Sequence, residues 1–148
     1  MIILHRLLGS LGFSGSNCKL LQAGRVPDRK VLRLAFSSDQ AVSRAAWDLL
    51  NARPQIISRE YLRDASGVAR LTPEAELVLR QPEAAEKTIA QVLRSLGSPS
   101  LPSAQIDYLL SLLKEHRMNK QGEVLSELGK IDPVLAKRLC AELLRNPG

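Results

Sequence analysis

Apolar side chains recur at helical spacing through the last third of the chain, residues 103–146. They form three stripes, each on one face of a 3.6-residue helix: Ile106, Leu109, Leu110 and Leu113; Val124, Leu125, Leu128 and Ile131; and Leu135, Leu139 and Leu143. Asp132 followed by Pro133 supplies a capping carboxylate and a first helical residue for the third helix. No such helix can bury its stripe alone, so the rest of the chain must provide the other walls of a helical core.

The first of these helices is expected to run from Ser103, a suitable N-cap, to Lys120, with Gly122 beyond its charged end. Upstream, the triplet Ser37-Ser38-Asp39 offers a choice of caps for a helix that Pro54 ends or redirects. Residues 56–63 read as a short helix stopped by a turn.

Two similar triplets, Thr72-Pro73-Glu74 and Gln81-Pro82-Glu83, are each expected to open a helix. Residues 97–102 are rich in Gly, Ser and Pro and are expected to form a linker. Leu and Ala dominate and β-branched residues are scattered. The sequence therefore predicts an all-α fold of about six helices, either a helical bundle or a short, solenoid-like array of helical hairpins.

The formal charge of +6 is concentrated near the N-terminus. Residues 1–37 carry six basic residues and one acid, a net +5, whereas residues 38–148 carry fifteen basic and fourteen acidic residues, a net +1. The first segment is therefore predicted to be a basic leader, and residues 38–148 a single helical domain.

The leader is acid-poor, contains Arg and Ser, and is amphipathic at its start, so it resembles a mitochondrial import presequence. That resemblance implies a mitochondrial location if the chain is eukaryotic, and a cytoplasmic one is expected otherwise. The alternative is an ordinary N-terminal helix that packs Leu4, Leu8 and Leu11 on the body. No run in the sequence approaches the ~18 apolar residues of a membrane span.

Residues 58–69 resemble the first helix and turn of a helix-turn-helix, with Leu62 inward and Gly67 in the turn. Arg63 and Pro73 depart from that motif, so a plain helix-loop-helix is the alternative.

The pattern V-L-x-x-L-G occurs at Val92–Gly97 and again at Val124–Gly129, an offset of 32 residues that is typical of helical-hairpin repeats. Residues 106–128 also resemble one pentatricopeptide repeat, a family that binds single-stranded RNA, and this resemblance implies an RNA-binding surface. Chance similarity among leucine-rich helices is the alternative.

Catalytic chemistry finds no support in the sequence. The histidines His5 and His116 lie far apart, the latter in a charged helix end, and the cysteines Cys18 and Cys140 match no metal spacing. We therefore predict a protein that is not an enzyme, with no catalytic, cofactor-binding or metal-binding residues.

The leading functional prediction is a helical adaptor that docks another protein. Tyr108 and Leu112 widen the apolar arc of their helix, and they are the predicted partner-binding residues if that edge is exposed. The alternative is a nucleic-acid-binding regulatory protein, which requires one continuous basic face formed by Arg59, Arg63, Arg70, Lys114, Arg117 and Lys120. The oligomeric state is left open.

Overall fold

The computed structural model describes residues 26–97 and 101–145. These residues form eight helices and one antiparallel β-hairpin, in the order α3 (Asp28–Leu34), α4 (Gln40–Ala52), α5 (Gln55–Ser58), β1 (Tyr61–Arg63), β2 (Ala69–Leu71), α6 (Pro73–Leu79), α7 (Glu86–Leu96), α8 (Ser103–Leu113), α9 (Met118–Ile131) and α10 (Pro133–Arg145). The prediction of a largely helical protein is confirmed. The hairpin corrects the all-α assignment.

A short helix was predicted at residues 56–63, but α5 ends at Ser58 and residues 61–63 form the first strand of the hairpin. One carboxylate oxygen of Asp64, Oδ1, accepts hydrogen bonds from the backbone N–H groups of Ser66 and Val68, at 2.9 and 3.0 Å. Gly67 adopts a φ of +85°, which few residues other than glycine tolerate. These contacts fix a tight turn, so residues 58–69 do not form a helix-turn-helix.

Three predicted caps are present. Asp39 accepts hydrogen bonds from Ala41 N and Val42 N at the start of α4. The Thr72 hydroxyl accepts one from Ala75 N at the start of α6, and the Asp132 carboxylate accepts one from Leu135 N at the start of α10. Short side-chain acceptors at these positions satisfy N–H groups that have no partner within the helix.

Other predicted helix boundaries are wrong. Pro102, not Ser103, occupies the N-cap position of α8, which already ends at Leu113. Gly122 consequently lies inside α9 and not beyond a helix end. The helix expected directly after residues 81–83 begins only at Glu86.

The packed part of the chain begins earlier than residue 38. Three residues of α3, Val31, Leu32 and Leu34, are buried, and the helix packs on α4, α5 and α6. The predicted leader, residues 1–37, therefore contains a helix that belongs to the core. Residues 1–25, with the proposed presequence and Leu4, Leu8 and Leu11, lie outside the described residues.

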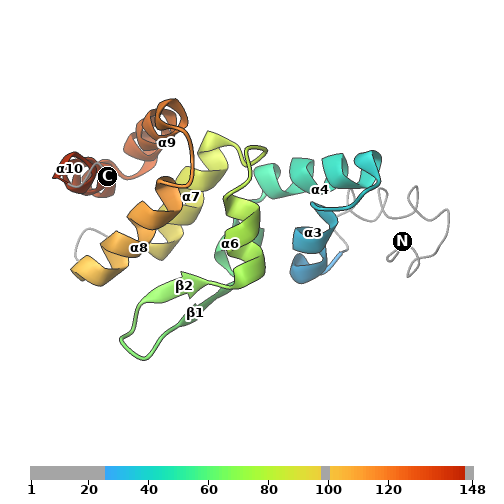
Figure 1. Cartoon of the computed structure of the whole chain (residues 1–148), viewed down its shortest axis with the longest axis horizontal. Coiled ribbons are helices and arrows are strands. Elements are labelled where there is room, and N and C mark those ends of the chain that lie inside the picture. The colour runs from blue at the N-terminus through green and yellow to red at the C-terminus, as the bar shows by residue number, and fades with distance from the viewer. Residues whose placement is uncertain (1–25, 98–100, 146–148) are drawn as a thin grey trace.

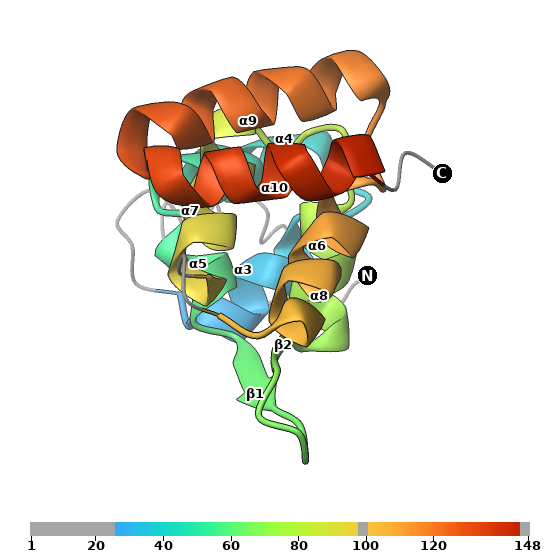
Figure 2. The ribbon, with the colours of Figure 1, turned by 90° about the vertical axis from the view of Figure 1, so that its left-hand side faces the viewer.

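Helix α7 occupies the middle of the molecule and packs against α4, α5, α8 and α9. Figure 1 shows α3 and α4 at one end, α9 and α10 at the other, and the hairpin projecting between them. In Figure 2, α9 and α10 lie side by side above the body, and the hairpin extends from the opposite side.

The two helices that carry the V-L-x-x-L-G pattern, α7 and α9, pack on each other. Of the two helices that follow it in the chain, α8 packs mainly on α10 and not on α9. α8 and α9 therefore do not form the packed helical hairpin that the pentatricopeptide resemblance implied.

Gly97 ends α7 at a crowded point. A Cβ atom there would lie 2.7 Å from Leu109 Cδ1 and 3.3 Å from Leu135 Cδ2. The first residue of the predicted linker is thus part of the core contact among α7, α8 and α10, while residues 98–100 lie outside the described residues.

Candidate functional site

Tyr108 and Leu112, the predicted anchors for a protein partner, lie in the interior, where they are 6% and 2% exposed. The Tyr108 hydroxyl accepts a hydrogen bond from Leu71 N at 2.9 Å and donates one to Glu76 Oε2 at 2.6 Å. The apolar arc of α8 is therefore wide because the whole arc, including Tyr108 and Leu112, is buried. Neither side chain offers a surface anchor.

The surroundings of Tyr108 suit a structural role. Burial, followed by the hydrogen bond to Glu76, raises the pKa of Tyr108 well above its usual range, so the hydroxyl stays protonated. The guanidinium carbon of Arg70 lies 4.9 Å from the ring centroid, within cation–π distance. Tyr108 thus connects the hairpin to α6 and α8.

The six basic residues of the nucleic-acid hypothesis fall into two groups. Arg63 and Arg70 lie on the hairpin and Arg59 just before it, whereas the second group follows α8 or lies in α9: Lys114, Arg117 and Lys120. The hairpin and the α8–α9 connection lie on opposite sides of the body (Figures 1 and 2).

Most of these cations already have contacts within the chain. Arg70 Nε lies 3.0 Å from Asp64 Oδ2, and Arg59 Nη1 lies 3.7 Å from Asp28 Oδ2. Arg63 donates to Gly67 O at 3.0 Å, and Lys120 Nζ donates to Pro82 O at 2.8 Å. The described residues therefore bring these six side chains together only in part, and not as one continuous basic face.

His116 does not lie at a solvated helix end, as the sequence suggested. It is 7% exposed, and its Nε2 lies 2.9 Å from Leu79 O, which can only accept a hydrogen bond. Gln121 Nε2 donates to His116 O at 2.7 Å. Burial lowers the pKa of His116, so the ring is neutral at pH 7 and fixes the α8–α9 turn on the end of α6.

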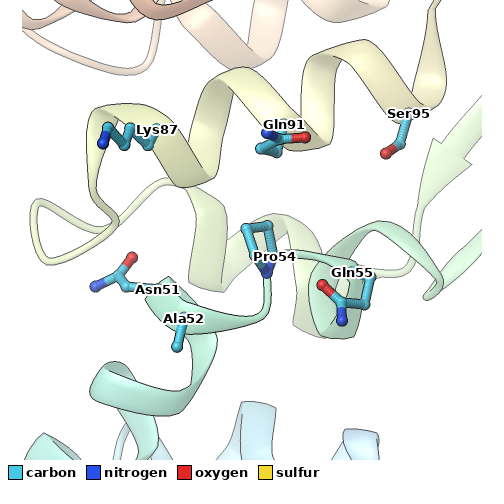
Figure 3. A pocket seen from close by; sticks show the side chains of 7 residues that line it. All are labelled: Asn51, Ala52, Pro54, Gln55, Lys87, Gln91 and Ser95. Carbon is cyan, nitrogen blue, oxygen red and sulfur yellow. The ribbon is translucent and has the colours of Figure 1, made fainter. Parts of the chain in front are cut away.

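An open groove of about 400 Å³ lies between the α4–α5 segment and α7. Seven residues line it: Asn51, Ala52, Pro54, Gln55, Lys87, Gln91 and Ser95. Figure 3 shows the three α7 side chains along one side and the residues from the end of α4 and the start of α5 along the other.

The α7 side of the groove follows from helical periodicity. Lys87, Gln91 and Ser95 are spaced by four residues and share one face of the helix. The opposite face of α7 is apolar and buried: Ile89, Val92, Leu93 and Leu96. Burial of that face turns the polar row outward.

Asn51 fixes the separation of the two sides. Its Oδ1 atom accepts hydrogen bonds from Ala85 N at 3.0 Å and from the Thr88 hydroxyl at 2.7 Å, and its Nδ2 atom donates to Glu83 O at 3.1 Å. The end of α4 is thereby attached to the start of α7. Asn51 acts as a side-chain cap for a helix whose own N-cap residue, Ala85, has none.

Pro54 forms the other side of the groove with Gln55. α4 ends at Ala52, and the chain bends at Arg53 before α5 begins. Ile56 and Ile57 then turn into the core, and Gln55 stays exposed at the edge of the groove, on the side opposite α7 (Figure 3).

The groove offers hydrogen-bonding side chains and one charge. Gln55 and Gln91 each carry an amide donor and acceptor, Ser95 carries a hydroxyl, and Lys87 is the charged residue among the seven. This set suits a ligand with alternating donors and acceptors. The four-residue spacing of Lys87, Gln91 and Ser95 can be seen in the sequence. The residues on the other side of the groove could not be identified in this way, because tertiary packing brings them there.

Among the described residues, no cluster of three or more His, Cys, Asp or Glu side chains could hold a metal ion. Nor is any helix of the described ranges long and apolar enough to cross a membrane. No protein-family model, curated protein or solved structure matches the chain. The functional assignment therefore rests on the groove and on the surfaces around it.

Proposed function

We propose that this chain is a non-enzymatic helical adaptor that holds an extended segment of another protein in the groove between α4–α5 and α7. The observation that carries the proposal is the row Lys87, Gln91 and Ser95 opposite Gln55. An extended polypeptide presents an N–H and a C=O at every residue, and glutamine amides can bond to both.

The dimensions agree with a short peptide. Eight residues separate Lys87 from Ser95, which at 1.5 Å per residue is about 12 Å along α7. An extended chain covers that length with about four residues. We therefore expect a core recognition segment of about four residues, with a carboxylate at the end that lies near Lys87.

Nucleic-acid binding is the alternative. A phosphate backbone carries a charge on every nucleotide and needs several cations along its path. Lys87 is the cation of the groove, and the six basic residues of the nucleic-acid hypothesis lie in two separate groups. These observations favour a polypeptide ligand.

The cellular location of the adaptor follows from the N-terminal segment, which resembles a mitochondrial import presequence. If the residues before α3 direct import, the adaptor works inside mitochondria, and otherwise in the cytoplasm.

Selection from a library of random peptides displayed on phage tests the proposal. We expect enrichment of segments that carry an acidic residue, and their dissociation constants can be measured by fluorescence anisotropy. Gln91→Ala should weaken binding about threefold to tenfold, because one hydrogen bond contributes about 0.5–1.5 kcal/mol. Lys87→Glu should weaken acidic peptides more strongly, because it places like charges together.

Arg94→Ala is the matched control, since Arg94 is an exposed residue of α7 outside the groove. It should bind as the wild type does. A single-stranded RNA oligonucleotide provides the second arm. Tight, salt-dependent RNA binding without peptide enrichment would refute the adaptor proposal and support the alternative.

A further inference from the structure

The hairpin has two edges, and their backbone groups are used differently. Thr72 N donates to Glu60 O and Asp64 N donates to Val68 O, both at 2.9 Å. In an antiparallel pair the residues that exchange hydrogen bonds alternate with residues that do not. Leu62 therefore directs its N–H and C=O toward β2, whereas Tyr61 and Arg63 direct theirs away from the hairpin.

The outer edge of β2 is occupied by side chains of α8. Gln105 Oε1 accepts from Ala69 N at 2.7 Å, and Gln105 Nε2 donates to Ala69 O at 2.9 Å. Tyr108 accepts from Leu71 N. Two buried side chains thus take the place of a third strand.

The outer edge of β1 has no such cover. Within residues 26–97 and 101–145, the outward N–H and C=O groups of Tyr61 and Arg63 have no protein partner. The side chains are exposed as well, 41% for Tyr61 and 71% for Leu62. An exposed strand edge with apolar side chains readily pairs with another strand.

We infer that β1 pairs antiparallel with β1 of a second copy of this chain, around a two-fold axis at Leu62. In that register Tyr61 faces Arg63 of the other copy, and both such pairs can exchange two hydrogen bonds. All four outward groups of each strand are then satisfied. Because the surface is the same on both copies, the contact is closed and produces a dimer.

The side chains select this register. Leu62 faces Leu62 across the axis in a pair without mutual hydrogen bonds, where side chains approach closely. Each Tyr61 ring faces an arginine, which permits cation–π contact. A shift that placed Arg63 opposite Arg63 would set like charges together and would leave Tyr61 without its partner.

The next pair outward places Glu60 opposite Asp64 of the other copy. Each carboxylate already has an arginine partner in its own chain: Arg29 Nε lies 3.0 Å from Glu60 Oε1, and Arg70 Nε lies 3.0 Å from Asp64 Oδ2. Their mutual repulsion is thereby reduced. The paired edge is three residues long, so the dimer is weak and its population depends on concentration.

Sedimentation velocity of the full chain over a series of concentrations tests the inference. The weight-average mass should rise with concentration from 16.3 kDa toward twice that value. Arg63→Pro removes an outward N–H that the hairpin itself does not use, and proline is tolerated at such an edge position. Arg63→Pro should remain a monomer, whereas Arg63→Ala, which keeps the N–H, should still associate.

Leu62→Lys changes only an exposed side chain and keeps the experiment decisive if Arg63→Pro fails to fold. It places two lysines opposite each other and should weaken association more than tenfold. In a background of Cys18→Ser and Cys140→Ser, Leu62→Cys should form a disulfide-linked dimer on oxidation, and Leu144→Cys should not. A full chain that is monomeric at every concentration, or association that both Arg63→Pro and Leu62→Lys leave unchanged, would overturn the inference.

Discussion

At Gly97 the end of α7 meets α8 and α10 with no room for a side chain. Its backbone is extended, with φ −126° and ψ 160°, so an alanine is excluded by contact and not by conformation. Gly122, by contrast, is exposed inside α9 with nothing within 4 Å of an added Cβ.

Two alanine substitutions should therefore act in opposite directions. Gly97→Ala should lower the free energy of unfolding by about 1–3 kcal/mol, because Leu109 and Leu135 must shift. Gly122→Ala should raise it by up to about 1 kcal/mol, because alanine is the better helix former. Urea unfolding followed by far-ultraviolet circular dichroism measures both. Equal effects would mean that α7, α8 and α10 do not meet at Gly97.

The buried His116 makes stability depend on pH. Its pKa is lowered in the folded chain from a reference value of 6.5, so the unfolded chain binds the proton more readily. The free energy of unfolding should therefore be at its full value above pH 6.5 and decrease as the pH falls through and below that value.

His116→Gln retains an N–H donor for Leu79 O and does not titrate. Urea unfolding at pH 7.5 and pH 5.5 should show a smaller loss for His116→Gln than for the wild type. His5 is present in both chains and cancels in the comparison. An identical loss in the two proteins would show that His116 is not buried as a neutral ring.

Residue patterns show which side chains share a face but not what covers that face. The sequence placed Tyr108 and Leu112 correctly on the apolar arc of α8, yet both are buried. Tyr108 is held there by Leu71 and Glu76, which lie more than 30 residues away in sequence. The groove was missed for the same reason. Its α7 row is local, but Asn51 and Gln55 join it only through tertiary packing.

At the scale of elements, local signals found the helices that begin with a side-chain cap. Asp39, Thr72 and Asp132 mark starts that the structure confirms. α7 could not be placed in this way, because its cap, Asn51, lies 34 residues before Ala85. The hairpin was missed because three-residue strands carry little periodicity and because Gln105 and Tyr108 support it from a distant helix.

Helix α3 gives an element-scale prediction that reverses the expectation of an independent domain at residues 38–148. A chain that begins at residue 38 should be less stable than one that begins at residue 26, by several kcal/mol. Burial of each aliphatic side chain contributes about 1.5–3 kcal/mol, and Val31, Leu32 and Leu34 are all buried.

Thermal and urea unfolding of residues 1–148, 26–148 and 38–148 would measure the effect. Equal stability of the two shorter chains would show that α3 is not part of the core. The comparison of 1–148 with 26–148 separates α3 from the residues that precede it. A targeting role for those preceding residues stays a prediction.

At the scale of the whole molecule, α7 connects the two halves of the chain. Its apolar face packs on α8 and α9, and its ends and flank contact α4 and α5. The polar row of α7 lies on the surface that this packing leaves open, in the groove of Figure 3. The adaptor proposal therefore concerns a surface that is held in place by the core on both sides.

The most direct test of that proposal is nuclear magnetic resonance of the ¹⁵N-labelled chain during titration with a peptide selected for binding. The side-chain NH₂ groups of Gln55 and Gln91 give their own signals, and hydrogen bonding to a peptide should shift both. Backbone signals of Lys87 and Ser95 should shift with them, while that of Arg94 should change less. Shifts confined to the hairpin or to the outer faces of α9 and α10, with the Gln55 and Gln91 side-chain signals unmoved, would contradict the account.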